Sequence, residues 1–157
     1  MKNLIIISFL LIALHGFGQD KSLPQPEAYF SAIIVNDIDT SINWYKQHLD
    51  FNVIHRFQSE DNEFRQASIV CGNILIELIE IKSSVTADEL LKNKPKRTMI
   101  DGFFKIGFLV DEFDAWVNRL REAEVEIHGR VVTDKNLGKR MLIIKDPDGN
   151  RMQLFEK

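Results

Sequence analysis

The sequence is poor in cysteine and has no excess of positive charge, and each absence excludes a class of protein. Cys71 is the only cysteine among 157 residues, so the chain cannot form an internal disulfide. Because Cys71 lies far beyond the N-terminal region, it offers no attachment site for a lipid anchor after a signal sequence. The 20 basic and 23 acidic residues give a net charge of -3 and are scattered along the chain, which argues against a nucleic acid partner.

The first eighteen residues have the composition of a secretory signal peptide. A lysine gives a positive start, and the apolar run from Leu4 to Leu14 is too short to span a bilayer comfortably. Gly16 and Gly18 are small residues at the positions that a signal peptidase inspects. We therefore predict a signal peptide over 1–18 and a linker over 19–28. The mature protein is expected to be periplasmic or secreted, without membrane insertion; the alternative, a buried N-terminal helix, lacks an amphipathic stripe.

The rest of the chain repeats one pattern of predicted elements. Strand-forming runs at 29–35 and 103–110 each precede acidic residues at which a helix can start. The two helices that follow are amphipathic, with apolar faces made by Ile42, Tyr45 and Leu49 in the first copy and by Phe113, Trp116, Val117 and Leu120 in the second. After each helix we predict three extended segments, at 52–58, 63–71 and 73–81, then at 126–133, 139–145 and 151–156.

Each copy is therefore a βαβββ unit, and residues 29–157 are predicted to form one domain. Module one covers 29–82, a connector covers 83–101, and module two covers 102–157. The connector has no sustained pattern apart from a short helical turn near 87–92. Because each helix covers one face of its strands, the other face needs a partner or a ligand.

Two stretches of the sequence, IIVNDIDTSINWYKQHLDF and DPDGNRMQLFE, carry a resemblance to a known family. The first resembles the opening strand and helix of vicinal oxygen chelate proteins, which include glyoxalases, bleomycin-resistance proteins and dioxygenases, and the second resembles the hairpin and last strand of their second module. The resemblance covers 29–156 and implies an α+β fold, in which two tandem βαβββ modules form a half-open eight-stranded barrel around a central cleft. In that family the modules pair within one chain or across a homodimer, and the sequence leaves both open.

Metalloenzymes of this family bind a divalent ion with one residue from the first strand and one from the fourth strand of each module. The resemblance places these four positions at Phe30, Glu77, Lys105 and Gln153. Only Glu77 is a good ligand, because phenylalanine has no lone pair to offer, a protonated lysine has donors alone, and a glutamine is a weak neutral ligand. We therefore predict neither a metal nor another cofactor.

The same four positions suggest what lines the cleft. Glu77 is the candidate catalytic base, and Lys105 its electrostatic partner, standing where a metal cation would have been. Strand alternation adds further cleft-facing side chains, among them Ala32, Ile34 and Leu109. The candidate ligand-binding residues are Phe30, Leu75, His128, Arg151 and Gln153. Taken singly, each has an ordinary structural or solvated explanation; together they make an apolar pocket with a few polar groups, as in small-molecule sites.

Two functions remain open at the level of the sequence. The first is a metal-free module that holds a small organic molecule, as the bleomycin-resistance branch does. The second is a lyase or isomerase of the same family that uses Glu77 as a base, either independent of metal or with a residual metal site. No motif in the chain determines a reaction type, and one fold hosts many chemistries.

Overall fold

The computed structural model describes residues 28–95, 98, 102–135 and 137–157. The predicted signal peptide, and all of the predicted linker except Ala28, lie outside these residues. Within them the chain forms two four-stranded sheets. No strand pairing joins one sheet to the other in the described part of the chain, so the sheets do not close into a barrel there. No helix in the same part is long and apolar enough to cross a membrane.

The two sheets have the same topology. The first has the spatial order β1 (Ser31–Ile34), β4 (Ile74–Ile81), β3 (Phe64–Cys71), β2 (Asn52–Gln58). The second has the order β5 (Ile106–Val110), β8 (Arg151–Glu156), β7 (Arg140–Lys145), β6 (Val132–Thr133). In each sheet the first strand of the module runs parallel to the fourth, and the other neighbours are antiparallel. The predicted α+β class and the βαβββ repeat are confirmed.

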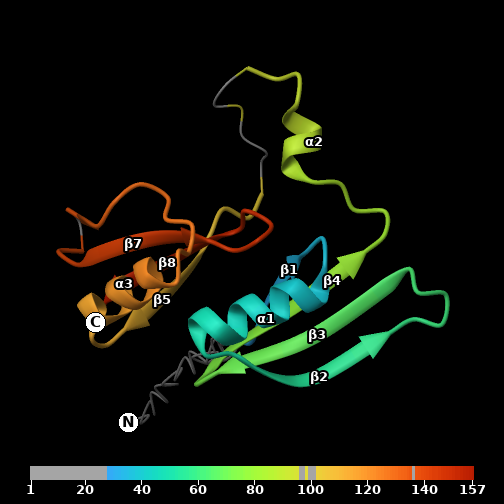
Figure 1. The fold of residues 1–157 in the computed structure, drawn as a ribbon, viewed down its shortest axis with the longest axis horizontal. Helices are drawn as coiled ribbons and strands as arrows, with labels where there is room; N and C mark the ends of the chain where they lie inside the picture. Colours follow the sequence, from blue (N-terminus) through green and yellow to red (C-terminus); the bar gives the residue numbers. More distant parts are fainter. Residues whose placement is uncertain (1–27, 96–97, 99–101, 136) are drawn as a thin grey trace, which may run out of the picture.

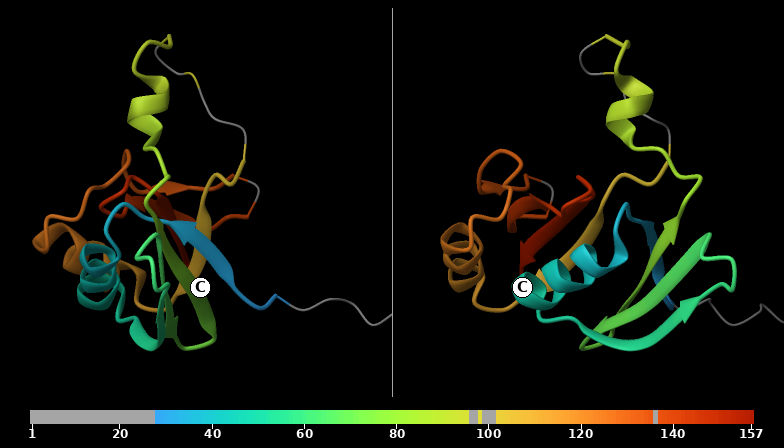
Figure 2. Two further views of the ribbon diagram at one scale, coloured as in Figure 1. Left: turned by 90° about the vertical axis from the view of Figure 1, so that its right-hand side faces the viewer. Right: turned by 45° about the vertical axis from the view of Figure 1, so that its right-hand side comes forward.

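One helix of each module covers its sheet, and both helices lie on the same side of the molecule. These are α1 (Ile38–Leu49), between β1 and β2, and α3 (Phe113–Glu122), between β5 and β6. Figures 1 and 2 show α1 and α3 on one side of the two sheets. The opposite face of each sheet has no helix over it. The short helix α2 (Ala87–Leu91), which the sequence predicted as a turn, stands apart from both sheets (Figure 1).

The first helix has well-defined boundaries. Asp37 is its N-cap and accepts a hydrogen bond from the backbone N–H of Thr40 at 2.6 Å. The helix ends at Asp50, which adopts the left-handed conformation with φ 58°. Helix α3 starts after Glu112, whose side chain makes no capping hydrogen bond. The predicted apolar faces of both helices are buried, with Trp116 only partly so.

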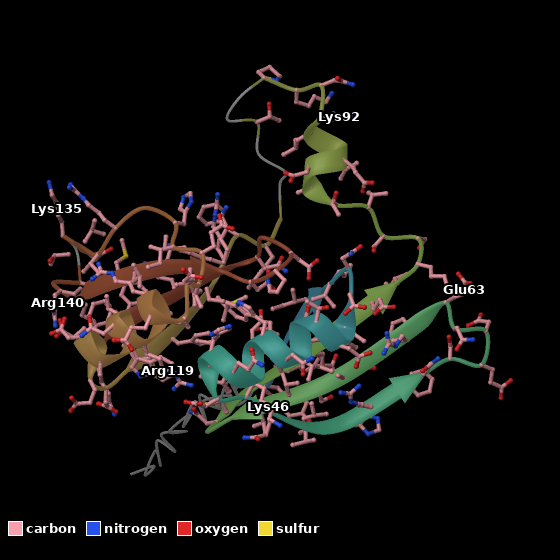
Figure 3. All side chains as sticks on the ribbon, viewed as in Figure 1. Lys46, Glu63, Lys92, Arg119, Lys135 and Arg140 are labelled. Carbon is pink, nitrogen blue, oxygen red and sulfur yellow. The ribbon has the colours of Figure 1, made fainter. Side chains whose placement is uncertain are left out.

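The two modules share one core on the helix side. The rings of Phe51 and Phe108 lie 6.3 Å apart between their centres, which joins the first module to the second. Arg119 of α3 adds a polar link, because it donates hydrogen bonds to both carboxylate oxygens of Asp50 at 2.6 and 2.7 Å and to the Gln47 carbonyl at 3.0 Å (Figure 3). An arginine from one module thereby satisfies a free carbonyl at the end of the other module's helix.

A repeated ion-pair arrangement is further evidence for the two-module plan. Arg65 of β3 and Arg140 of β7 each bind one acidic residue in the first turn of the module's helix and one on the module's fourth strand. These acids are Asp39 and Glu80 in the first module and Asp114 and Glu156 in the second. The arrangement ties each helix start to its own sheet.

One predicted strand is wrong for most of its length. The segment 126–133 forms a ladder only at Val132–Thr133, preceded by a single bridge between Ile127 and Ile144. Gly129 lies between these pairings with φ 88°, a conformation that an extended strand does not contain. The chain therefore leaves the sheet at Gly129, and the second module has a much shorter edge strand than the first.

Candidate ligand-binding site

The face of each sheet opposite the helices has no helix over it (Figures 1 and 2), and we call it the open face. In β1, Ile33 points to the core while Ile34 is 55% exposed, and in β5, Phe108 points to the core while Leu109 is 62% exposed. This alternation is what the pleat of a half-covered sheet produces. It agrees with the predicted assignment of Ala32, Ile34 and Leu109 to the cleft side.

Glu77 and Gln153 hold equivalent places on this open face. In the first sheet Glu77 lies in register with Ala32 on one side and Ser68 on the other. In the second, Gln153 lies in register with Gly107 and Ile143. Glu77 and Gln153 therefore hold equivalent positions in the two sheets, and these are the positions that the comparison of the two sequence repeats paired with each other.

The four family ligand positions do not fit a divalent metal. Phe30 has no donor atom, and Lys105 presents an ammonium group that would repel the ion. The Gln153 side chain is 1% exposed, its Nε2 faces the Met141 sulfur, and its Oε1 is buried without a hydrogen-bond partner. No group of three or more His, Cys, Asp and Glu side chains suited to a metal occurs in the part of the chain that the structure describes.

Glu77 and Lys105 are not paired with each other. No ion pair or hydrogen bond joins Glu77 to any other described residue, although its side chain is half-buried. The Nζ of Lys105 instead lies 5.8 Å from the centre of the Phe104 ring. The predicted role of Lys105 as a direct partner of Glu77 has no contact within the described residues to support it.

A cavity of about 500 Å³ lies at the seam of the two modules. Its walls come from β1, the chain entering β5, the turn before β8 and the start of that strand, and helix α2, with Thr98 also contributing. The lining residues are Ala32, Ile33, Ile34, Ala87, Leu91, Phe103, Phe104, Lys105, Ile106, Gly149, Asn150, Arg151 and Met152. Small-molecule sites usually enclose about 300–1,000 Å³, so the cavity has the size of such a site.

The charged side chains among the described lining residues are both cations. Lys105 and Arg151 line the cavity, and none of its described lining residues is an aspartate or glutamate. The guanidinium carbon of Arg151 lies 4.6 Å from the centre of the Phe104 ring, close enough for a cation–π contact. Neither cation forms an ion pair with another residue of the described chain.

The turn that forms one cavity wall is held rigidly by a buried carboxylate. Asp146 accepts hydrogen bonds from the Tyr45 hydroxyl at 3.2 Å, from Asn150 Nδ2 at 2.9 Å, and from the backbone N–H groups of Asp148 and Asn150. Burial raises the pKa of Asp146 above its ordinary value. Burial, and then the negative charge of Asp146, raise the pKa of Tyr45. The turn is thereby fixed to α1, and with it the position of Arg151.

The same turn also binds the chain entering α1. Asp148 accepts a hydrogen bond from the Asn36 backbone N–H at 3.0 Å and another from the Ser41 hydroxyl at 3.2 Å. These contacts link the closing hairpin of module two to the strand-to-helix corner of module one. The cavity at the seam therefore has walls from both modules in a fixed relation.

Of the seven site residues predicted from the sequence, the structure brings two into this cavity, Lys105 and Arg151. Phe30, Leu75, Glu77 and Gln153 do not line it. His128 is exposed at the outer edge of the second sheet, where its backbone N–H donates to the Ile143 carbonyl at 2.8 Å. Sequence reasoning missed Phe104, although the sequence shows two adjacent aromatic residues, Phe103 and Phe104, directly before Lys105.

Two βαβββ modules that share a core on one side and leave an open face and a seam cavity on the other define a protein of the vicinal oxygen chelate class. The family model of the Glyoxalase/Bleomycin resistance protein/Dioxygenase superfamily matches residues 29–154. The chain belongs to this superfamily.

Solved structures agree with this fold. The chain is similar to the glyoxalase family protein from Enterococcus faecalis, with a TM-score of 0.70, 21% identity, and coverage of 83% of this chain and 97% of that one. It is also similar to the lactoylglutathione lyase from Agrobacterium tumefaciens, with a TM-score of 0.60, 21% identity, and coverage of 85% and 96%.

A third similar structure is the fosfomycin resistance protein from Listeria monocytogenes, solved with Mn(II) and sulfate. Its TM-score is 0.61, with 13% identity and coverage of 85% of this chain and 94% of that one. At such identities these similarities define the fold alone. No curated protein matches the sequence.

Proposed function

We propose that this protein is an exported binding protein that holds a small organic molecule in the cavity at its module seam, without a metal ion. The observation that carries the proposal is the cavity itself, with a volume of about 500 Å³, apolar walls and two cations that have no acidic partner among the described residues. An apolar pocket with a few convergent polar groups is the usual composition of a small-molecule site.

The proposal that no metal is needed rests on the chemistry of the side chains. A catalytic zinc site has about three protein ligands, and the four family positions of this chain offer one carboxylate and a buried amide. Elemental analysis of protein purified without chelators should therefore find far less than one metal ion per chain. A content close to one equivalent of zinc, nickel, manganese or iron would overturn this part of the proposal.

A lyase or isomerase that uses Glu77 as its base is the second candidate. The observation in its favour is that the Glu77 carboxylate is half-buried on the open face and has no partner within the described residues. A carboxylate that no cation neutralises is available to accept a proton from a substrate. Since Glu77 does not line the seam cavity, this reaction would take place on the neighbouring part of the open face.

A thermal-shift screen of small organic compounds tests the binding proposal, because a compound that binds only the folded protein raises the melting temperature. Compounds that stabilise the unmutated protein should not stabilise Ala32→Phe, in which an aromatic ring fills part of the cavity. Asn118→Phe is the matched control, because it adds the same ring to the exposed side of α3. Equal shifts in the unmutated protein and Ala32→Phe would place binding elsewhere.

The same compounds separate the two candidate functions. A binding protein returns each compound unchanged, whereas a lyase or isomerase converts one of them. If conversion is found, Glu77→Gln should abolish it while the thermal shift caused by the compound persists, because an amide retains the size of the side chain and loses the basic oxygen. Unchanged conversion by Glu77→Gln would exclude Glu77 as the base.

A further inference from the structure

We infer that the seam cavity selects an organic anion, with Lys105 and Arg151 holding its charged group and the apolar walls holding its body. The inference rests on the proposed binding function and names the class of molecule that is bound. Its first support is that both cations line the cavity and that none of the described lining residues is acidic.

Arg151 differs from every other half-buried arginine in the described residues. Arg65, Arg119 and Arg140 each bind one or two carboxylates. Arg151 is also half-buried, yet it binds no carboxylate and instead lies against the Phe104 ring. A guanidinium group that is partly removed from water gains most from a carboxylate or similar anion in its own plane, and stacking on a ring leaves those in-plane donors free.

Lys105 places a second positive charge beside the same ring. Its Nζ lies 5.8 Å from the centre of the Phe104 ring, and the Arg151 guanidinium carbon lies 4.6 Å from it. Like charges near one aromatic ring repel each other, and a bound anion that attracts both cations offsets this repulsion. The other two polar side chains of the described lining are already engaged, since Asn150 Nδ2 donates to Asp146 at 2.9 Å and the Thr98 hydroxyl donates to the Pro95 carbonyl at 2.8 Å. Lys105 and Arg151 are therefore the described lining residues available to bind the charged group of a ligand.

The remaining walls suit an apolar body. Phe103 and Ile34 are 74% and 55% exposed although both are large hydrophobic residues that line the cavity. Ala32, Ile106 and Leu91 complete the apolar wall. A molecule that covers these side chains removes apolar surface from water, which favours binding. The class of ligand is therefore an apolar or aromatic carboxylate, rather than a sugar or a small inorganic anion.

Calorimetry with 2-naphthoate and its neutral analogue 2-naphthamide tests the inference. The two probes share the same ring system and differ in charge, so their difference in affinity isolates the contribution of the cations. For the unmutated protein we expect 2-naphthoate to bind at least about tenfold more tightly, as charge-assisted hydrogen bonds require. This preference should disappear in the double variant Lys105→Gln, Arg151→Gln and persist in Lys46→Gln, which removes a charge from the exposed side of α1 (Figure 3).

The salt dependence of probe binding to the unmutated protein gives a second test, which does not depend on whether the double variant folds. Added sodium chloride should weaken 2-naphthoate binding to the unmutated protein and leave 2-naphthamide binding almost unchanged. Binding of both probes should be lost in Ala32→Phe, which locates them in the cavity.

Three results would overturn the inference. Equal affinity for the two probes in the unmutated protein would show that charge plays no part and would leave the proposed binding function intact for neutral molecules. Retention of the preference by the correctly folded double variant would place the anion site elsewhere. Absence of binding by either probe would exclude aromatic carboxylates as the ligand class, and the thermal-shift screen would then decide the proposed function separately.

Discussion

Gln153 occupies in the second sheet the place that Glu77 occupies in the first, yet only Gln153 is buried. The neighbour in register differs between the two, since Ala32 stands beside Glu77 and Gly107 beside Gln153. The Phe155 ring lies against Gly107, 3.8 Å from where a Cβ atom would be. The missing side chain of Gly107 thus leaves room for an aromatic ring beside Gln153.

Gln153→Met should leave the protein at least as stable as before. Methionine has a similar length and no polar group, so it removes a buried carbonyl oxygen that has no partner. An unsatisfied buried polar group costs about 1–3 kcal/mol, and we expect the free energy of unfolding to rise by roughly 1 kcal/mol. Urea denaturation measures this change. A loss of stability greater than about 1 kcal/mol would mean that Gln153 makes a hydrogen bond in solution, for example to water.

Leu120→Ala should destabilise the protein strongly. Leu120 is fully buried on the core face of α3. Truncation of such a leucine costs about 2–4 kcal/mol through lost burial and the cavity that remains. The control is Asn118→Ala on the exposed side of the same helix, which should change the unfolding free energy by less than about 0.5 kcal/mol. Equal effects of the two substitutions in urea denaturation would contradict the assigned helix face.

Tyr45→Phe should lower the stability of the folded protein at neutral pH. It should also make the loss of stability at alkaline pH less steep. At pH 7 the variant loses one buried hydrogen bond to Asp146, which is worth about 0.5–1.5 kcal/mol. Burial, followed by the charge of Asp146, raises the pKa of Tyr45 in the folded protein. A phenol whose pKa is raised on folding contributes stability that is complete below the unfolded value of about 10 and is lost as the pH rises above it.

Thermal unfolding measured from pH 7 to above 10 provides the test for Tyr45. The unmutated protein should lose stability more steeply than Tyr45→Phe in the alkaline part of this range. Tyr29→Phe is the matched control, because Tyr29 is 78% exposed and should leave the profile unchanged. Identical alkaline profiles for the unmutated protein and Tyr45→Phe would show that this phenol does not set the pH dependence.

Expression in an exporting bacterial host should yield a shortened protein. The apolar run and the small residues before Gln19 predict cleavage after Gly18, which mass spectrometry of the recovered protein detects. Leu10→Arg places a charge within the apolar run and should leave the chain uncleaved in the cytosol. Recovery of the unmutated protein as a soluble cytosolic chain that retains Met1 would contradict the predicted export.

Local patterns in the sequence predicted most of the fold. Apolar residues at helical spacing identified the buried faces of α1 and α3, and strand alternation identified which side chains of β1 and β5 leave the core. Both patterns arise from the geometry of a single element, so they can be read without knowledge of its neighbours. The prediction of a continuous strand at 126–133 was wrong because Gly129 has a positive φ of 88°, which interrupts the strand. The sequence alone does not show whether a glycine adopts this conformation.

The sequence by itself determined the two modules and the chemistry of the four family positions, because residue type settles whether a side chain can ligate a metal. Only the tertiary structure decided where a ligand can fit. The cavity takes Ala32 from the first strand, Phe104 from the segment that enters β5 and Arg151 from the last strand. These residues are far apart along the chain, and the packing of one module against the other, which no local pattern encodes, brings them together.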